Sequence, residues 1–265
     1  MIKSDKTEYL VASGKRLEIA WHGPLPNVAP TLIFLHEGLG CVGMWRDFPE
    51  KLSLATGCGA LVYSRLGYGK SDPCKLPLPL TCMHYEGLEV LPELIKKAGI
   101  REYILVGHSD GASIALIYAG STPAEKLHAI IAEAPHVFCE EKTVRQIRET
   151  KENYEQKDLR EKLIKYHGNN VDCAFYGWNE SWLDPDFMNW NIEAYVPAIK
   201  VPMLLIQGKD DEYGTLEQIK RIKQKVAAES LILDGCTHTP HYDQPEATLH
   251  AMTNFIARVL KPNQS

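Results

Sequence analysis

The sequence contains no long hydrophobic run and no excess of positive charge. No stretch reaches the roughly 18 consecutive apolar residues that a membrane-spanning helix requires, and residues 1–18 lack the apolar core of a secretory signal peptide. Lysine and arginine together number 29 against 34 acidic residues, which gives a formal net charge of -5. We therefore expect neither a nucleic-acid partner nor a membrane partner, and we expect a cytoplasmic location.

Closely spaced cysteine pairs are also missing. The seven cysteines are scattered and form no Cys-x-x-Cys motif; they are Cys41, Cys58, Cys74, Cys82, Cys139, Cys173 and Cys236. His128, His167 and His250 likewise have no neighbouring histidine or cysteine that would indicate a metal site. These patterns predict reduced thiols rather than a disulfide framework, and an enzyme that needs neither metal nor cofactor.

Short apolar runs alternate with helical patterns along most of the chain. The runs at 8–12 and 15–21 suggest an antiparallel hairpin. Six further runs are expected to be strands, at residues 31–36, 59–64, 102–108, 127–134, 201–208 and 229–235. Helical spacing of apolar residues appears at 85–97, 112–120, 215–226 and 246–260. This alternation is typical of an α/β protein whose mostly parallel sheet, here of eight strands, is flanked by helices.

Residues 138–199 interrupt the alternation with a stretch that contains no convincing strand. The stretch begins highly charged and ends rich in aromatic residues. We predict a core formed by residues 1–137 and 200–265, with residues 138–199 as a helical lid inserted after the sixth strand. We expect two or three of the lid aromatics to line an apolar acyl or aryl pocket, from among Phe175, Tyr176, Trp178, Trp182, Phe187 and Trp190.

The segment GHSDGAS, residues 107–113, follows the apolar run EYILV and precedes a helical pattern. Gly107 and Gly111 flank Ser109 in a G-x-S-x-G pattern, in which a sharp strand-to-helix turn exposes the serine hydroxyl. A plain connection between a strand and a helix would produce the same pattern, so the motif alone does not identify a nucleophile.

A base and an acid follow later strands in the order that a serine nucleophile requires. Asp210 and Asp211 come after the run ending at Gln207, and His238 and His241 come after the next run. Because the carboxyl ends of parallel strands meet at one edge of a sheet, these groups are expected to converge on Ser109. At this point either aspartate and either histidine fits the pattern.

Four segments of the chain resemble the α/β-hydrolase family: LHEGLG (35–40), YSRLGYGKSD (63–72), GHSDGAS, and the pair GKDDEYG and THTPHYDQPE. The resemblance covers residues 31–136 and 201–258. It implies a catalytic triad of Ser109, Asp211 and His238, with Asp210 and His241 as the alternatives. It also implies an oxyanion hole made by the backbone amides of Gly38 and Asp110, although Glu37 stands where the family usually has glycine.

Asp110 and Glu37 put negative charge beside the proposed nucleophile. Ser-Asp-Gly at this turn is similar to α-amino-acid ester hydrolases of the valacyclovir hydrolase type, and the likeness implies that Asp110 holds a substrate ammonium group. Alternatively, Asp110 is an acid that stabilises the first turn of a helix. Glu37 would discourage anionic acyl groups. The predicted substrate-binding residues are Glu37, Asp110, Trp178, Trp182 and Trp190.

The predicted function is hydrolysis of small carboxylic esters, thioesters or activated amides through an acyl-enzyme intermediate. A C–C bond hydrolase uses the same triad and is the nearest alternative, whereas serine at position 109 excludes enzymes with an aspartate nucleophile. A catalytically silent small-molecule receptor on the same fold is the alternative from another class. Residues 38–43 also fit a dinucleotide-binding G-x-G-x-x-G pattern, but the acidic residue expected further on is absent.

Overall fold

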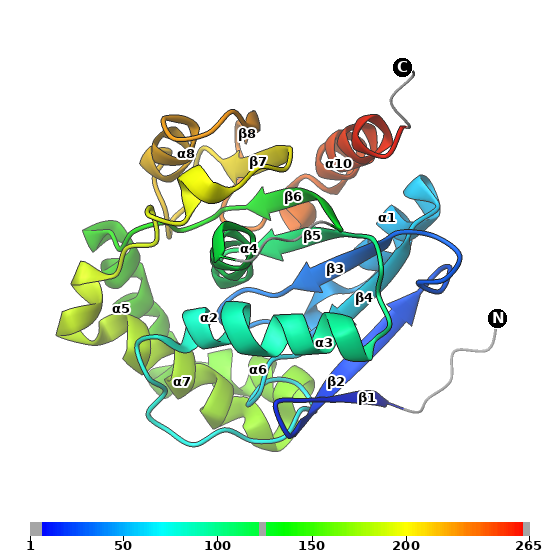
Figure 1. Ribbon diagram of the computed structural model, residues 1–265. Coiled ribbons are helices and arrows are strands. Elements are labelled where there is room, and N and C mark those ends of the chain that lie inside the picture. Colours follow the sequence, from blue (N-terminus) through cyan, green and yellow to red (C-terminus); the bar gives the residue numbers. More distant parts are fainter. Residues whose placement is uncertain (1–6, 122–125, 262–265) are drawn as a thin grey trace.

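The computed structural model describes residues 7–121 and 126–261. Eight strands form one sheet in the order β1-β2-β4-β3-β5-β6-β7-β8 (Figure 1). Their bounds are β1 (Glu8–Ala12), β2 (Lys15–His22), β3 (Thr31–Leu35), β4 (Gly59–Tyr63), β5 (Tyr103–His108), β6 (Leu127–Glu133), β7 (Met203–Gly208) and β8 (Glu229–Leu233). Strand β2 pairs antiparallel with β1 and β4, and every other pairing is parallel. The predicted eight-stranded, mostly parallel sheet is confirmed.

The central strands are apolar throughout because helices cover both faces of the sheet. On β3, Ile33 and Leu35 pack into one core while Leu32 and Phe34 pack into the other. The first core lies under α3 (Leu91–Lys97), α4 (Asp110–Ser121) and α8 (Glu217–Lys223). The second lies under α1 (Phe48–Thr56) and α10 (Pro245–Val259), which contact each other. The expected helix over 85–97 starts in α2 (Cys82–Tyr85) and passes through one π-helical turn (Glu86–Val90) before α3.

The inserted segment 138–199 forms three mutually contacting helices and contributes no strand to the sheet. They are α5 (Glu141–Gln156), α6 (Leu159–His167) and α7 (Val171–Leu183), and Figure 1 shows them grouped at one end of the molecule. The first residue of the segment, Phe138, pairs with Asn191 near its end in an isolated antiparallel bridge. The chain therefore leaves the sheet and returns to it at nearly the same place. A separate lid unit with these bounds stays a prediction.

One prediction about the cysteines is wrong. Cys74 and Cys173 form a disulfide, whereas reduced thiols were expected throughout. The two residues are 99 positions apart in sequence, and they meet because the loop after β4 packs against α7. At this separation the two cysteines form no recognisable spacing motif, so the pair could not be predicted from the sequence. The five other cysteines are free.

Candidate active site

The turn between β5 and α4 holds Ser109 in a strained conformation. Its φ angle is 53°, in the left-handed region that is unfavourable for a residue with a side chain. Glycine is needed on both sides of the turn, because a Cβ on Gly107 would lie 2.5 Å from the Gly111 carbonyl oxygen and one on Gly111 would lie 2.0 Å from that of Leu35. The Ser109 amide donates to the Glu133 carbonyl at 2.9 Å, which ties the turn to β6. The strain is thus supported by close packing on neighbouring strands.

The structure brings Ser109, His238 and Asp211 into one chain of hydrogen bonds. His238 Nε2 lies 2.9 Å from Ser109 Oγ, and His238 Nδ1 lies 2.9 Å from Asp211 Oδ1. Asp211 follows β7 and His238 follows β8, so adjacent strand ends deliver both groups to the turn after β5. An acceptor carboxylate at Nδ1 keeps the proton on that nitrogen and leaves Nε2 free to accept the serine proton.

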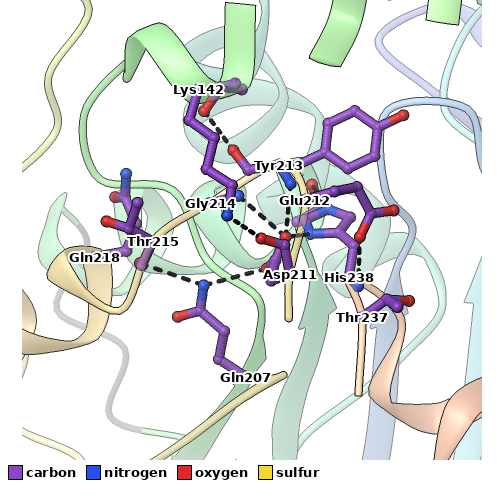
Figure 2. Close-up of polar contacts among 12 residues, drawn as sticks. Lys142, Gln207, Asp211, Glu212, Tyr213, Gly214, Thr215, Gln218, Thr237 and His238 are labelled. Carbon is purple, nitrogen blue, oxygen red and sulfur yellow. Dashed lines mark hydrogen bonds and ion pairs between the residues drawn. The ribbon is translucent and has the colours of Figure 1, made fainter. Parts of the chain in front are cut away.

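Four hydrogen bonds orient the Asp211 carboxylate (Figure 2). The amides of Tyr213 and Gly214 donate to Oδ1 at 2.8 and 3.0 Å, together with His238. Gln207 Nε2 donates to Oδ2 at 3.1 Å. In addition, Lys142 on α5 donates to the Asp211 carbonyl, so the inserted segment contacts the acid loop directly.

The buried acid and base shift each other's pKa. Burial alone would lower the pKa of His238, but the carboxylates of Asp211, Glu212 and Glu37, with Asp211 foremost, outweigh burial and raise it above the usual value. Burial would likewise raise the pKa of Asp211, yet His238 and the donated hydrogen bonds hold it well below its usual range. Asp211 is therefore ionised at neutral pH and favours a protonated His238, which is the charge state that forms when the serine gives up its proton.

The two predicted oxyanion donors lie beside Ser109. Gly38 follows β3, and Asp110 is the first residue of α4. Within residues 7–121 and 126–261, neither backbone amide donates a hydrogen bond to another protein group. Gly38 is covered by the Trp178 indole, since a Cβ at position 38 would lie 2.2 Å from the ring. Both amides are thus available to an oxygen atom held next to Ser109.

The alternative acid and base take other positions. Asp210 is exposed, and its amide donates to the Cys236 carbonyl at 3.0 Å. His241 is buried, and its Nδ1 lies 2.6 Å from Glu133 Oε2. Its ring stacks on Trp45. Neither residue contacts the serine, so the geometry favours Asp211 and His238.

Two cavities adjoin at the site. The smaller, of about 210 Å³, is lined by Ser109 and His238 and by the predicted substrate residue Glu37. The larger, of about 380 Å³, has mostly apolar walls, and Phe187 is one of the residues that line it. Asp110, Trp178 and Trp182 line both cavities and therefore form the wall between them. A substrate whose carbonyl lies at Ser109 has a large apolar space next to it.

The remaining predicted substrate residues differ in their surroundings. Glu37 is partly buried, and burial raises the pKa of its carboxyl to about 7. Trp190 lines neither cavity; it stacks on Phe187 and packs beside Trp182. The Asp110 carboxylate accepts from Trp182 Nε1 at 3.3 Å and lies 3.8 Å from Arg65 Nη2. Burial raises the pKa of Asp110, and Arg65 opposes that shift.

Sequence reasoning missed His136, which also lines the smaller cavity. Its ring packs against Trp182 and lies 5.7 Å, centroid to centroid, from the ring of His238. Burial lowers the pKa of His136 to about 3, so the imidazole is neutral. Its only sequence signal was a position just after a predicted strand, which many polar residues share.

Comparisons with known proteins agree with this architecture. The sequence profile of a family described as "Alpha/beta hydrolase family" matches residues 32–251. Among solved structures, an esterase from Exiguobacterium antarcticum is similar with a TM-score of 0.76 and 18% identity, covering 95% of this chain and 100% of that one. An enol-lactonase from Burkholderia xenovorans is similar with a TM-score of 0.70 and 17% identity, covering 94% and 100%. No curated protein matches the sequence. At these identities the structural likeness concerns the fold.

Proposed function

Since the chain belongs to the α/β-hydrolase family, we propose that this enzyme hydrolyses carboxylic esters through an acyl-enzyme intermediate on Ser109. The observation that carries the proposal is the continuous hydrogen-bonded chain from Ser109 through His238 to Asp211, with both distances at 2.9 Å. Thioesters and activated amides present the same acyl carbon and are included in the proposal.

In the proposed reaction, Ser109 Oγ attacks the carbonyl carbon while its proton passes to His238 Nε2. The carbonyl oxygen becomes an oxyanion that accepts from the amides of Gly38 and Asp110. The bond to the leaving alcohol then breaks, and His238 returns the proton to the alcohol oxygen. A water molecule repeats the attack on the acyl-enzyme, which releases the carboxylic acid and restores the serine hydroxyl.

The apolar cavity supports a substrate with a sizeable apolar group. Trp178, Trp182 and Phe187 line it, which supports the proposal that it receives an acyl or aryl group. Its volume of about 380 Å³ is within the range of small-molecule sites. We therefore infer that esters with long or aromatic groups are better substrates than acetyl esters.

A panel of p-nitrophenyl esters of increasing acyl length tests the proposal. Turnover by the wild-type enzyme and its loss in Ser109→Ala, with the fold intact by circular dichroism, are expected. Absence of turnover on every ester, thioester and activated amide would favour the silent receptor instead.

A further inference from the structure

Arg65 is a buried cation that lies outside the hydrogen-bonded chain of Ser109, His238 and Asp211. It lies just after β4, and its side chain is 9% exposed. Nη1 donates to the His36 carbonyl at 3.1 Å, and Nη2 donates to the Glu37 carbonyl at 3.0 Å. The Arg65 backbone amide also donates to His36 Nε2 at 3.0 Å. One residue thus fixes the two positions that precede Gly38.

The contact with the Glu37 carbonyl bears directly on the Gly38 amide, because the two groups belong to the same peptide unit. That carbonyl also accepts from His36 Nδ1 at 2.7 Å. The carbonyl and the N–H of a planar trans peptide point in opposite directions, so two donors on the oxygen set the direction of the Gly38 N–H. A cationic donor on the carbonyl also polarises the peptide and strengthens the N–H as a donor.

The guanidinium group of Arg65 also pairs with the side chain of Asp110, whose backbone amide is the second proposed oxyanion donor. Asp110 Oδ2 lies 3.8 Å from Arg65 Nη2, and Asp110 Oδ1 accepts from Trp182. Arg65 therefore contacts the peptide unit that carries the Gly38 amide and the side chain of Asp110. It also balances the carboxylate charge that would otherwise oppose an oxyanion nearby.

We propose that Arg65 is a positioning residue of the oxyanion hole, which orients the Glu37–Gly38 peptide and neutralises Asp110. The proposal rests on the proposed function, since it needs a reaction that passes through an oxyanion. A group with this role acts on the transition state, so its removal lowers kcat and leaves KM nearly unchanged.

The experiment compares Arg65→Met and Arg65→Lys with Arg258→Met. Arg258 pairs with Glu229 on the surface and lines neither cavity, so it is the control for loss of an arginine ion pair. We measure kcat and KM on a p-nitrophenyl ester, the melting temperature, and the inhibition constant of a trifluoromethyl ketone, whose adduct with Ser109 carries an oxyanion.

Arg65→Met is expected to lower kcat by about 10- to 100-fold, less than the roughly 100- to 1,000-fold cost of deleting one donor outright. The trifluoromethyl ketone should bind more weakly by a similar factor, while KM changes little. Arg65→Lys should fall between wild type and Arg65→Met, because lysine keeps the charge but cannot bridge two carbonyls with a rigid fork. Arg258→Met should retain wild-type kinetics.

A double variant, Arg65→Met with Asp110→Asn, separates positioning from charge balance. It removes the Asp110 charge that Arg65 faces but still lacks the donor to the Glu37 carbonyl. We expect kcat to stay well below that of Asp110→Asn alone. Full recovery to the level of Asp110→Asn would overturn the positioning role, because charge balance would then explain the whole effect.

Further results would also overturn the proposal. They are an unchanged kcat in Arg65→Met, and a rise in KM with kcat unchanged. If Arg65→Met does not fold, Arg65→Lys decides: wild-type kcat and inhibitor affinity in that variant refute the role. These failures are distinct from failure of the proposed function, in which the wild-type enzyme itself would hydrolyse no ester.

Discussion

Replacing Asp211 by asparagine should reduce turnover severely without moving the catalytic histidine. Asp211 Oδ1 accepts three hydrogen bonds. Two of them come from backbone amides, whose N–H directions are fixed by the chain and which can only donate. The asparagine oxygen should occupy that position, which places its NH₂ group toward Gln207. Gln207 can adapt by turning its amide, since its Oε1 is buried without a partner among the described residues. The substitution therefore removes the negative charge while preserving most of the geometry.

The expected magnitude follows from the distance between the two charges. His238 Nδ1 and Asp211 Oδ1 are 2.9 Å apart. At an effective dielectric constant of about 20, unit charges at that distance attract by about 6 kcal/mol. That energy, present once the imidazole is protonated, corresponds to roughly a 10⁴-fold loss in kcat, which agrees with the effect of the same change in other serine triads.

Asp210→Asn is the matched control, because Asp210 is the neighbouring aspartate and is exposed. Its kcat should stay within about threefold of wild type, since an exposed charge is screened by water. The assay is steady-state hydrolysis of a p-nitrophenyl ester, with melting temperatures to verify folding. A larger loss in Asp210→Asn than in Asp211→Asn would refute the assignment of the acid.

Three further predictions concern the surroundings of the triad. The charge of Glu37 raises the pKa of His238, so Glu37→Gln should move the ascending limb of the pH profile of kcat/KM to lower pH, because a base with a lower pKa becomes unprotonated at lower pH; an unchanged midpoint would show that Glu37 does not act on the base. An octanoyl ester should exceed an acetyl ester in kcat/KM by at least about tenfold, from burial of the chain in the apolar cavity, and equal rates would count against that cavity as the acyl site. An α-amino ester should have no higher kcat/KM than its uncharged isostere, because the Asp110 carboxylate already pairs with Arg65. A preference for the amino ester that Asp110→Asn abolishes would instead show that Asp110 binds the ammonium group.

The sequence was sufficient to predict the parts of the site that depend on strand ends. Ser109, Asp211 and His238 each follow a strand of a parallel sheet, and the sheet itself fixes where those ends meet. The sequence order of the three groups and the flanking glycines therefore predicted that they would converge, and in the structure they lie within hydrogen-bonding distance of one another.

Contacts between loops could not be predicted in this way. Arg65 reaches the carbonyls of His36 and Glu37 because two loops after neighbouring strands fold against each other, and no spacing in the sequence records that meeting. The same holds for the disulfide between Cys74 and Cys173. Trp190 shows a related limit, since an aromatic residue in a lid pattern can support a pocket residue, here Trp182, without lining the pocket.

Labelling with a fluorophosphonate tests whether Ser109 forms a covalent acyl-enzyme. Such a probe reacts with a serine that a neighbouring base activates, and mass spectrometry of peptides locates the adduct. We expect one adduct, on Ser109, together with complete loss of ester hydrolysis. In a folded Ser109→Ala variant we expect no adduct and no hydrolysis. An adduct on another residue, or hydrolysis that persists in Ser109→Ala, would contradict an acyl-enzyme on Ser109.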